Sequence, residues 1–152
     1  MFRGFCTVTV DPKGRLALPA RYREPVRACD SSTLVITLNP WDRCLWFYTL
    51  SEWETIDAKL LALPDGDLAS RRAKQMLRGH ACDCECDAQG RLLIPQDLRE
   101  FAGLGRRGAL LGQGNKLELW DAELWEQQRS AWFQAVESGD APSSSVLASL
   151  SL

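Results

Sequence analysis

Two arginines in this sequence follow a turn glycine at equivalent places, and both have the chemistry to bind a nucleic acid. Arg15 closes the segment 11–15 (DPKGR), and Arg91 closes the segment 87–91 (DAQGR). A guanidinium group can pair through two N–H groups with guanine O6 and N7 or with phosphate oxygens. We therefore expect Arg15 and Arg91 to contact double-stranded DNA.

The turns in front of these arginines carry the residues that type I turns favour. Asp11 and Asp87 stand at the first position, and Gly14 and Gly90 stand at the fourth. An arginine directly after such a turn can project beyond the sheet. We expect the aspartates and glycines to form the turns and the arginines to be free for binding.

The chain contains an internal repeat with a period of 76 residues. Residues 11–19 align without a gap with residues 87–95, and Arg23 aligns with Arg99, which makes six identities. The sequence is therefore a tandem duplication. Each copy alone has too few residues to bury a core, so we expect the two copies to share one sheet or barrel.

Basic residues concentrate towards the N-terminus, although the net charge is −2. Residues 1–78 carry 12 Lys and Arg against 9 Asp and Glu, whereas residues 79–152 carry 6 against 11. We expect Lys13, Arg3 and Arg21 to support the contacts with phosphate. Because the second copy has Gln89 in place of Lys13, the copies should contribute unequally.

The predicted fold class is α+β and β-rich, with peripheral helices. Each copy reads as a strand, a turn, a short strand, a helix opened by Pro19 or Pro95, a hairpin and a longer helix. Ser51 is predicted to cap the first long helix, with Glu54 three residues later. The expected organisation is a first unit at 1–52, a helical connector at 53–78, a second unit at 79–124, a C-terminal helix at 125–139 and a mobile tail at 140–152.

Three of the six cysteines, Cys82, Cys84 and Cys86, are spaced two residues apart. On a strand this spacing directs all three side chains to one face, which predicts a half-buried strand with free thiols. A metal site that adds His80, and a redox switch, are the alternatives. The spacing lacks the backbone curvature that a CxxC motif supplies, so we expect no metal and no cofactor.

Several functional classes find no support in the sequence. It has no glycine-rich phosphate loop, no nucleophile elbow and no metal-ligand spacing, so we expect neither an enzyme nor a small-molecule substrate. It also has no apolar run of membrane-spanning length, and its first residues alternate like a strand instead of resembling a signal peptide. We expect a cytoplasmic protein without a membrane partner.

The chain resembles the MraZ family over roughly residues 1–135. The resemblance rests on segments 1–4 (MFRG), 11–15, 19–23 (PARYR), 79–81 (GHA), 87–91 and the late pair Leu119 and Trp120. It implies two tandem SpoVT-AbrB (AbrB-like) swapped-hairpin units that form an intramolecular pseudo-dimer β-barrel. It also implies ring-shaped homo-oligomers.

The family resemblance implies a function as well. It implies a sequence-specific DNA-binding transcriptional regulator, mainly a repressor, that binds short direct repeats. The targets would be its own promoter and the division and cell-wall gene cluster, and the protein would associate with the nucleoid. The family's repeated Asp-x-x-x-Arg motif corresponds to 11–15 and 87–91, whereas the three spaced cysteines are outside the family pattern.

The alternative is an antitoxin-like or other protein-interaction module with secondary DNA binding. Antitoxins of this class usually join a single unit to a long neutralising tail. This chain has two units and a tail of about a dozen residues, too short to bury the ~800 Å² per partner of a standard interface. The sequence therefore favours the regulator.

Overall fold

The computed structural model describes residues 1–29 and 32–152. It divides into two compact units, residues 1–122 and residues 123–152, which are treated one at a time below. Within the described residues, no helix has the length and apolar character needed to cross a membrane.

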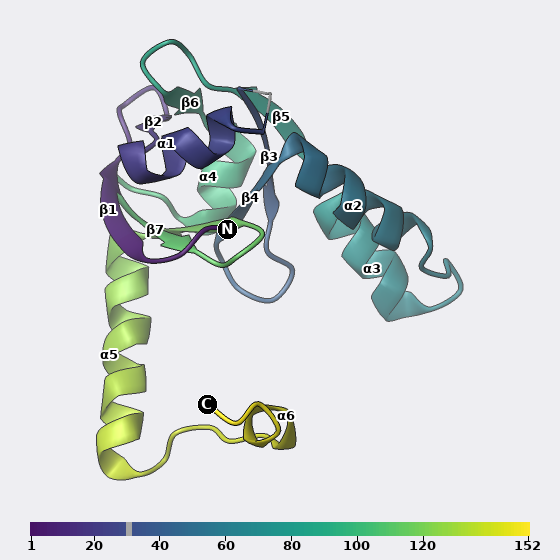
Figure 1. The fold of residues 1–152 in the computed structure, drawn as a ribbon, viewed down its shortest axis with the longest axis vertical. Helices are drawn as coiled ribbons and strands as arrows, with labels where there is room; N and C mark the ends of the chain where they lie inside the picture. Colours follow the sequence, from purple (N-terminus) through teal and green to yellow (C-terminus); the bar gives the residue numbers. More distant parts are fainter. Residues whose placement is uncertain (30–31) are drawn as a thin grey trace. The chain divides into compact units, whose positions relative to one another are not determined.

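The first unit contains both sequence copies (Figure 1). The first copy supplies β1 (Phe5–Thr9), β2 (Arg15–Ala17), α1 (Ala20–Arg27), β3 (Thr33–Leu38) and β4 (Leu45–Thr49). The second copy supplies β5 (Cys82–Glu85), β6 (Arg91–Leu93), α4 (Gln96–Ala102), β7 (Arg107–Gly112) and β8 (Leu117–Asp121). Between the copies lie α2 (Leu50–Leu61) and α3 (Leu68–Leu77).

The two copies interleave their strands. In the described residues, one sheet has the order β1-β7-β8-β4-β3-β5 and a second sheet joins β2 to β6, with antiparallel pairing throughout. The first strand of each copy thus pairs with a hairpin strand of the other: β1 with β7, and β5 with β3. The mixed α+β class predicted from the sequence is confirmed.

The small β2–β6 sheet brings equivalent residues of the two copies face to face. Leu16 lies opposite Leu92, which is its counterpart at a shift of 76 residues. Both leucines are completely buried. Successive residues of a strand point to opposite faces, so Arg15 and Ala17 lie on the other, outward face. The pairing therefore creates a pseudo-twofold centre with a buried side and an exposed side.

The core is shared by the copies, as the sequence predicts. Its fully buried large side chains come from both copies: Leu16, Leu18, Leu34, Ile36, Leu45, Phe47, Leu92, Ile94, Leu98, Leu110, Leu117 and Leu119. Burying a leucine side chain stabilises a fold by about 1.5–3 kcal/mol. Because these side chains contact one another across the repeat, removing either copy would expose the core of the other.

The short helices α1 and α4 begin directly after Pro19 and Pro95, as predicted. Proline has no N–H to lose there, and its fixed φ suits a helix start. The helix α1 buries Tyr22 and Val26 against the core. In α4 the equivalent positions are occupied by buried Leu98 and Ala102.

The connector helices α2 and α3 lie side by side and project from the sheet (Figure 1). The predicted cap of α2 is wrong: Thr49, not Ser51, is the N-cap, and its hydroxyl accepts from the Glu52 N–H at 3.3 Å. The helix begins earlier because β4 runs directly into it. A separate cluster of Trp46, Tyr48, Leu60 and Leu77 packs these helices onto the sheet.

The spaced cysteines lie where the alternation predicts. Cys84 is buried in β5, Cys82 and Cys86 are half-buried, and Asp83 and Glu85 are exposed between them. All three thiols are free. Burial raises the pKa of Cys84 to about 12, and its neighbour Cys82 adds to the shift. The thiol of Cys84 is therefore fully protonated at neutral pH and serves packing.

The second unit contains most of α5 (Ala122–Ser138) and the short α6 (Ser145–Ala148). Gly139, with φ of +78°, follows Ser138 and ends the long helix. Trp125 and Trp132 meet edge to face at 5.4 Å between ring centroids. Trp132, Phe133 and Val136 are exposed on the helix, which leaves an apolar face on this unit.

Candidate nucleic-acid interface

The first Asp-to-Arg turn is a closed network of local hydrogen bonds. The Gly14 N–H donates to the Asp11 carbonyl at 2.9 Å, and the Asp11 N–H donates to the Arg15 carbonyl at 2.9 Å. The Oδ1 atom of Asp11 accepts from the N–H groups of Lys13 and Arg15, both at 2.9 Å. Its Oδ2 atom accepts from Arg15 Nε at 2.7 Å. One carboxylate thus forms the turn and also anchors the arginine.

The second turn repeats this geometry almost atom for atom. The Gly90 N–H donates to the Asp87 carbonyl at 2.9 Å. Asp87 Oδ1 accepts from the N–H groups of Gln89 and Arg91 at 2.9 Å, and its Oδ2 accepts from Arg91 Nε at 2.8 Å. The two copies therefore present the same anchored arginine.

These hydrogen bonds set the ionisation of both aspartates. In each turn the N–H of the following arginine contributes most, and the arginine side chain adds a hydrogen bond and an opposite charge. Together they hold the pKa of Asp11 and the pKa of Asp87 below the ordinary value. Both carboxylates are ionised at neutral pH, so each anchor is a charge-assisted bond.

Each turn glycine has a left-handed backbone and lies against an arginine of the other copy. Gly14 has φ of +86°, and a Cβ placed there would lie 2.4 Å from Cζ of Arg99. Gly90 has φ of +76°, and a Cβ there would lie 2.6 Å from Nε of Arg23. Only glycine satisfies both the backbone conformation and the close approach.

Arg23 and Arg99 therefore belong to the site, although the sequence interpretation did not include them among the binding residues. The Nε of Arg23 donates to the Leu18 carbonyl at 3.1 Å, and the Nε of Arg99 donates to the Ile94 carbonyl at 2.9 Å. The alignment of Arg23 with Arg99 in the repeat was the sequence feature that could have identified both as site residues. Each arginine holds the strand of its own copy against the turn of the other.

The outward face of the β2–β6 sheet carries both candidate arginines. Arg15 lies opposite Leu93, and Arg91 lies opposite Ala17, so the two arginines are diagonal neighbours, with Cα atoms about 7–8 Å apart. Their side chains are 36% and 39% exposed. Because the aspartates engage only Nε, the terminal Nη atoms of both guanidinium groups are available to one ligand.

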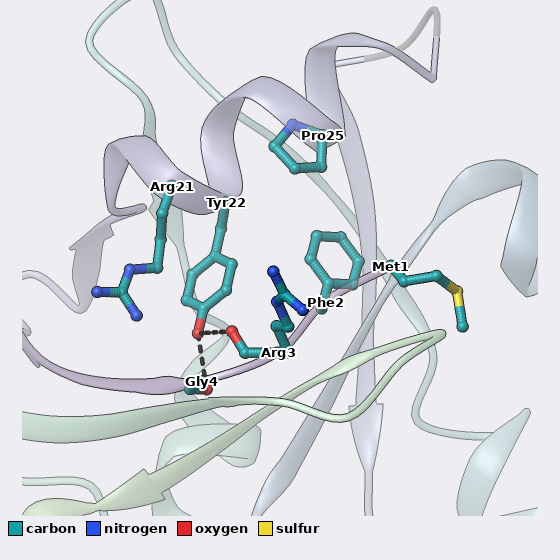
Figure 2. A pocket seen from close by; sticks show the side chains of 7 residues that line it. All are labelled: Met1, Phe2, Arg3, Gly4, Arg21, Tyr22 and Pro25. Atoms are coloured by element: carbon teal, nitrogen blue, oxygen red, sulfur yellow. Dashed lines mark hydrogen bonds between the residues drawn. The ribbon is translucent and has the colours of Figure 1, made fainter.

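Two other predicted residues, Arg3 and Arg21, lie at a different place, on either side of Tyr22 (Figure 2). They line a hollow of about 460 Å³ with Met1, Phe2, Gly4, Tyr22 and Pro25 (Figure 2). The Tyr22 hydroxyl donates to the carbonyls of Arg3 at 3.1 Å and Gly4 at 2.8 Å. The structure thus places the predicted residues in two groups: Arg15, Arg91 and Lys13 lie at the paired turns, whereas Arg3, just before β1, and Arg21, on α1, line the hollow.

The described residues contain no group of three His, Cys, Asp or Glu side chains arranged to hold a metal ion. His80 is exposed, and its Nδ1 lies 2.9 Å from the Met76 carbonyl. What the site does offer is a set of guanidinium groups on a rigid scaffold. Such groups bind anions that have several acceptor oxygens, and a nucleic-acid backbone presents these at regular intervals.

Comparison with known proteins gives consistent results over the whole chain. The family model described as "MraZ protein, putative antitoxin-like" matches residues 1–76 and again residues 76–143. The protein named transcriptional regulator MraZ from Halorhodospira halophila is 49% identical over 152 residues, all of both chains. Its namesake from Coxiella burnetii is 50% identical over 132 residues, 87% of each chain.

Proposed function

Because this chain belongs to the MraZ family, whose curated relatives are named transcriptional regulators, we propose that it regulates transcription by binding specific DNA sequences. The observation that carries the proposal is the pair of aspartate-anchored arginines, Arg15 and Arg91, on one outward face of the β2–β6 sheet. Duplex DNA is itself pseudo-symmetric, so a pseudo-twofold pair of cations can engage equivalent groups on it.

In this mechanism Arg15 and Arg91 contact base edges or phosphates through their Nη atoms. The Asp11 and Asp87 anchors fix each guanidinium before DNA arrives, which lowers the entropy lost on binding. Lys13 supports them on phosphate from the turn, and Arg3, before β1, and Arg21, on α1, do so from the hollow of Figure 2. The phosphate contacts position the protein, and the base contacts provide specificity.

We further propose that the two copies are AbrB-like swapped-hairpin units that together form an intramolecular pseudo-dimer barrel. The exchange of first strands between copies supports this assignment, since β1 pairs with β7 and β5 pairs with β3. The unit bounds proposed from the sequence, 1–52 and 79–124, contain all the strands of the respective copies. On this view neither copy folds without the other.

The proposed assembly is a ring-shaped homo-oligomer bound to short direct repeats. A single repeat would bind one protomer weakly, and joining several such sites would raise avidity by about 10² to 10⁴ without new contact types. The targets would be its own promoter and the division and cell-wall gene cluster, with repression as the main outcome. The protein would then reside in the cytoplasm, associated with the nucleoid.

A gel shift with the DNA upstream of the protein's own gene tests this proposal. Arg15→Ala should weaken binding by about 1–3 kcal/mol. The fold should survive, because alanine keeps the backbone N–H that donates to Asp11. Arg72→Ala, a change at an exposed arginine of α3, is the control and should bind normally. Equal binding by Arg15→Ala and wild type would refute the assignment of Arg15.

The spacing between DNA repeats separates the regulator from the antitoxin-like alternative, which the description of the matched family model also names. A regulator that reads direct repeats as an oligomer should lose affinity when half a helical turn is inserted between them. An interaction module with secondary DNA binding should be insensitive to the insertion. It should instead retain a protein partner in a pull-down from cell extract.

A further inference from the structure

The turns of the two copies have equivalent neighbours in the large sheet. The Val10 N–H donates to the Arg106 carbonyl at 2.8 Å, and the Cys86 N–H donates to the Ser32 carbonyl at 2.9 Å. Val10 and Cys86 are counterparts at a shift of 76 residues. Arg106 therefore occupies, beside the first turn, the place that Ser32 occupies beside the second.

The next residue along each strand extends the comparison. Thr9 lies opposite Arg107 in the β1–β7 pair, and Glu85 lies opposite Thr33 in the β5–β3 pair. Residues directly opposite one another project on the same face of a sheet. Arg107 at the first turn thus corresponds to Thr33 at the second, and Thr9 corresponds to Glu85.

The two ends of the small β2–β6 sheet, where the turns lie, consequently differ in charge although the turns have the same geometry. The first end carries Lys13, Arg106 and Arg107, all exposed. At the same positions the second end carries Gln89, Ser32 and Thr33, and it adds the exposed carboxylate of Glu85. The first end thus has three cations at positions where the second end has none.

The two ends also differ in the ion pairs that their described residues form. In the part of the chain that the structure describes, no carboxylate lies within 4.0 Å of the charged groups of Lys13, Arg106 or Arg107. By contrast, Arg27, whose charge acts on Cys86 at the second end, lies 3.7 Å from Glu24. Among the described residues, the charge at the first end is therefore not neutralised by an ion pair.

We propose that Arg106 and Arg107 of the second copy join Lys13 of the first in binding DNA phosphates beside Arg15. The DNA-binding end is then a composite of both copies, and the second turn makes the weaker contact. This inference rests on the proposed function. It adds Arg106 and Arg107 to the binding residues and makes the first turn the stronger DNA contact. It also explains how a chain of net charge −2 can hold a polyanion.

Salt dependence gives the inference a quantitative form. Each phosphate neutralised by a cation contributes about 0.9 to the slope of log K against log salt concentration. Two arginines that each bind one phosphate contribute about 1.8. Between 50 and 200 mM salt, the wild-type affinity should then fall about tenfold more than that of a variant without them.

The test is a gel shift at several salt concentrations with Arg106→Ser combined with Arg107→Thr, which installs the residues of the second end. We expect weaker binding and a slope smaller by about 1.8. The matched control is Arg71→Ser combined with Arg72→Thr on α3, which makes the same change in net charge at exposed positions. It should keep the wild-type slope.

The possible outcomes distinguish a failure of this inference from a failure of the proposed function. If wild type binds no specific DNA, both fail. If wild type binds and Arg15→Ala does not, but the Arg106 and Arg107 variant keeps the wild-type slope, only this inference is wrong. Lys13→Gln provides an independent check, because it should lower the slope by about 0.9. Thermal melting confirms that each variant is folded before its binding is compared.

Discussion

Replacing Gly14 with alanine tests whether the two copies hold each other's turns. The new methyl group would meet two obstacles. The backbone φ of +86° places an L-residue in the left-handed region, and the added Cβ would lie 2.4 Å from Cζ of Arg99. Because the neighbour is a side chain from the other copy, the substitution probes an interface between copies through a change in a local turn.

The expected loss of stability follows from these two obstacles. An L-residue in the left-handed conformation costs about 1–2 kcal/mol. Arg99 must also move, which breaks its hydrogen bond to the Ile94 carbonyl at 2.9 Å, a further loss of about 1 kcal/mol or more. A total of about 2–3 kcal/mol should lower the melting temperature of a chain of this length by about 4–12 °C.

Thermal unfolding followed by circular dichroism at fixed protein concentration measures this loss. Gly66→Ala is the control, since a Cβ at Gly66 meets nothing within 4 Å, and its melting temperature should match or slightly exceed that of wild type. A double variant that adds Arg99→Ala should lose less stability than the sum of the single variants. A melting temperature for Gly14→Ala equal to that of Gly66→Ala would refute the reasoning.

Three further predictions concern the turn, the thiols and the core. The pKa of Asp11 is lowered in the fold, so its stabilisation is present above the unfolded value of about 3.9 and disappears as the pH falls through the lower folded value. The free energy of unfolding, measured as the pH is lowered, should show this loss in wild type. It should depend less on pH in the acid range in Asp11→Asn. Buried Cys84, with its pKa of about 12, should resist iodoacetamide at pH 8 while exposed Cys29 is alkylated, as mass spectrometry of native protein would show. Leu16→Ala and Leu92→Ala should each cost about 2–5 kcal/mol in denaturant unfolding, and clearly unequal losses would contradict the pseudo-twofold packing.

The local chemistry of the turns was predictable from the sequence. Asp11 and Gly14 are three residues apart, so the hydrogen bonds that join them depend on few other parts of the chain. The same holds for the helix starts at Pro19 and Pro95 and for the alternating cysteines of β5. The cap of α2 was not predictable, because Thr49 with Glu52 and Ser51 with Glu54 both fit the capping pattern. The end of the β4 strand decides between them.

By itself the sequence determined the duplication, the turns at 11–14 and 87–90 and the shared core, because each depends on residue types at fixed short spacings or on the repeat. Tertiary structure decided which residues of one copy meet those of the other. Arg99 lies against Gly14, and Arg106 and Arg107 lie beside the first turn, through strand pairing between distant segments. Such pairing depends on the register of the whole sheet, and no local pattern carries that information.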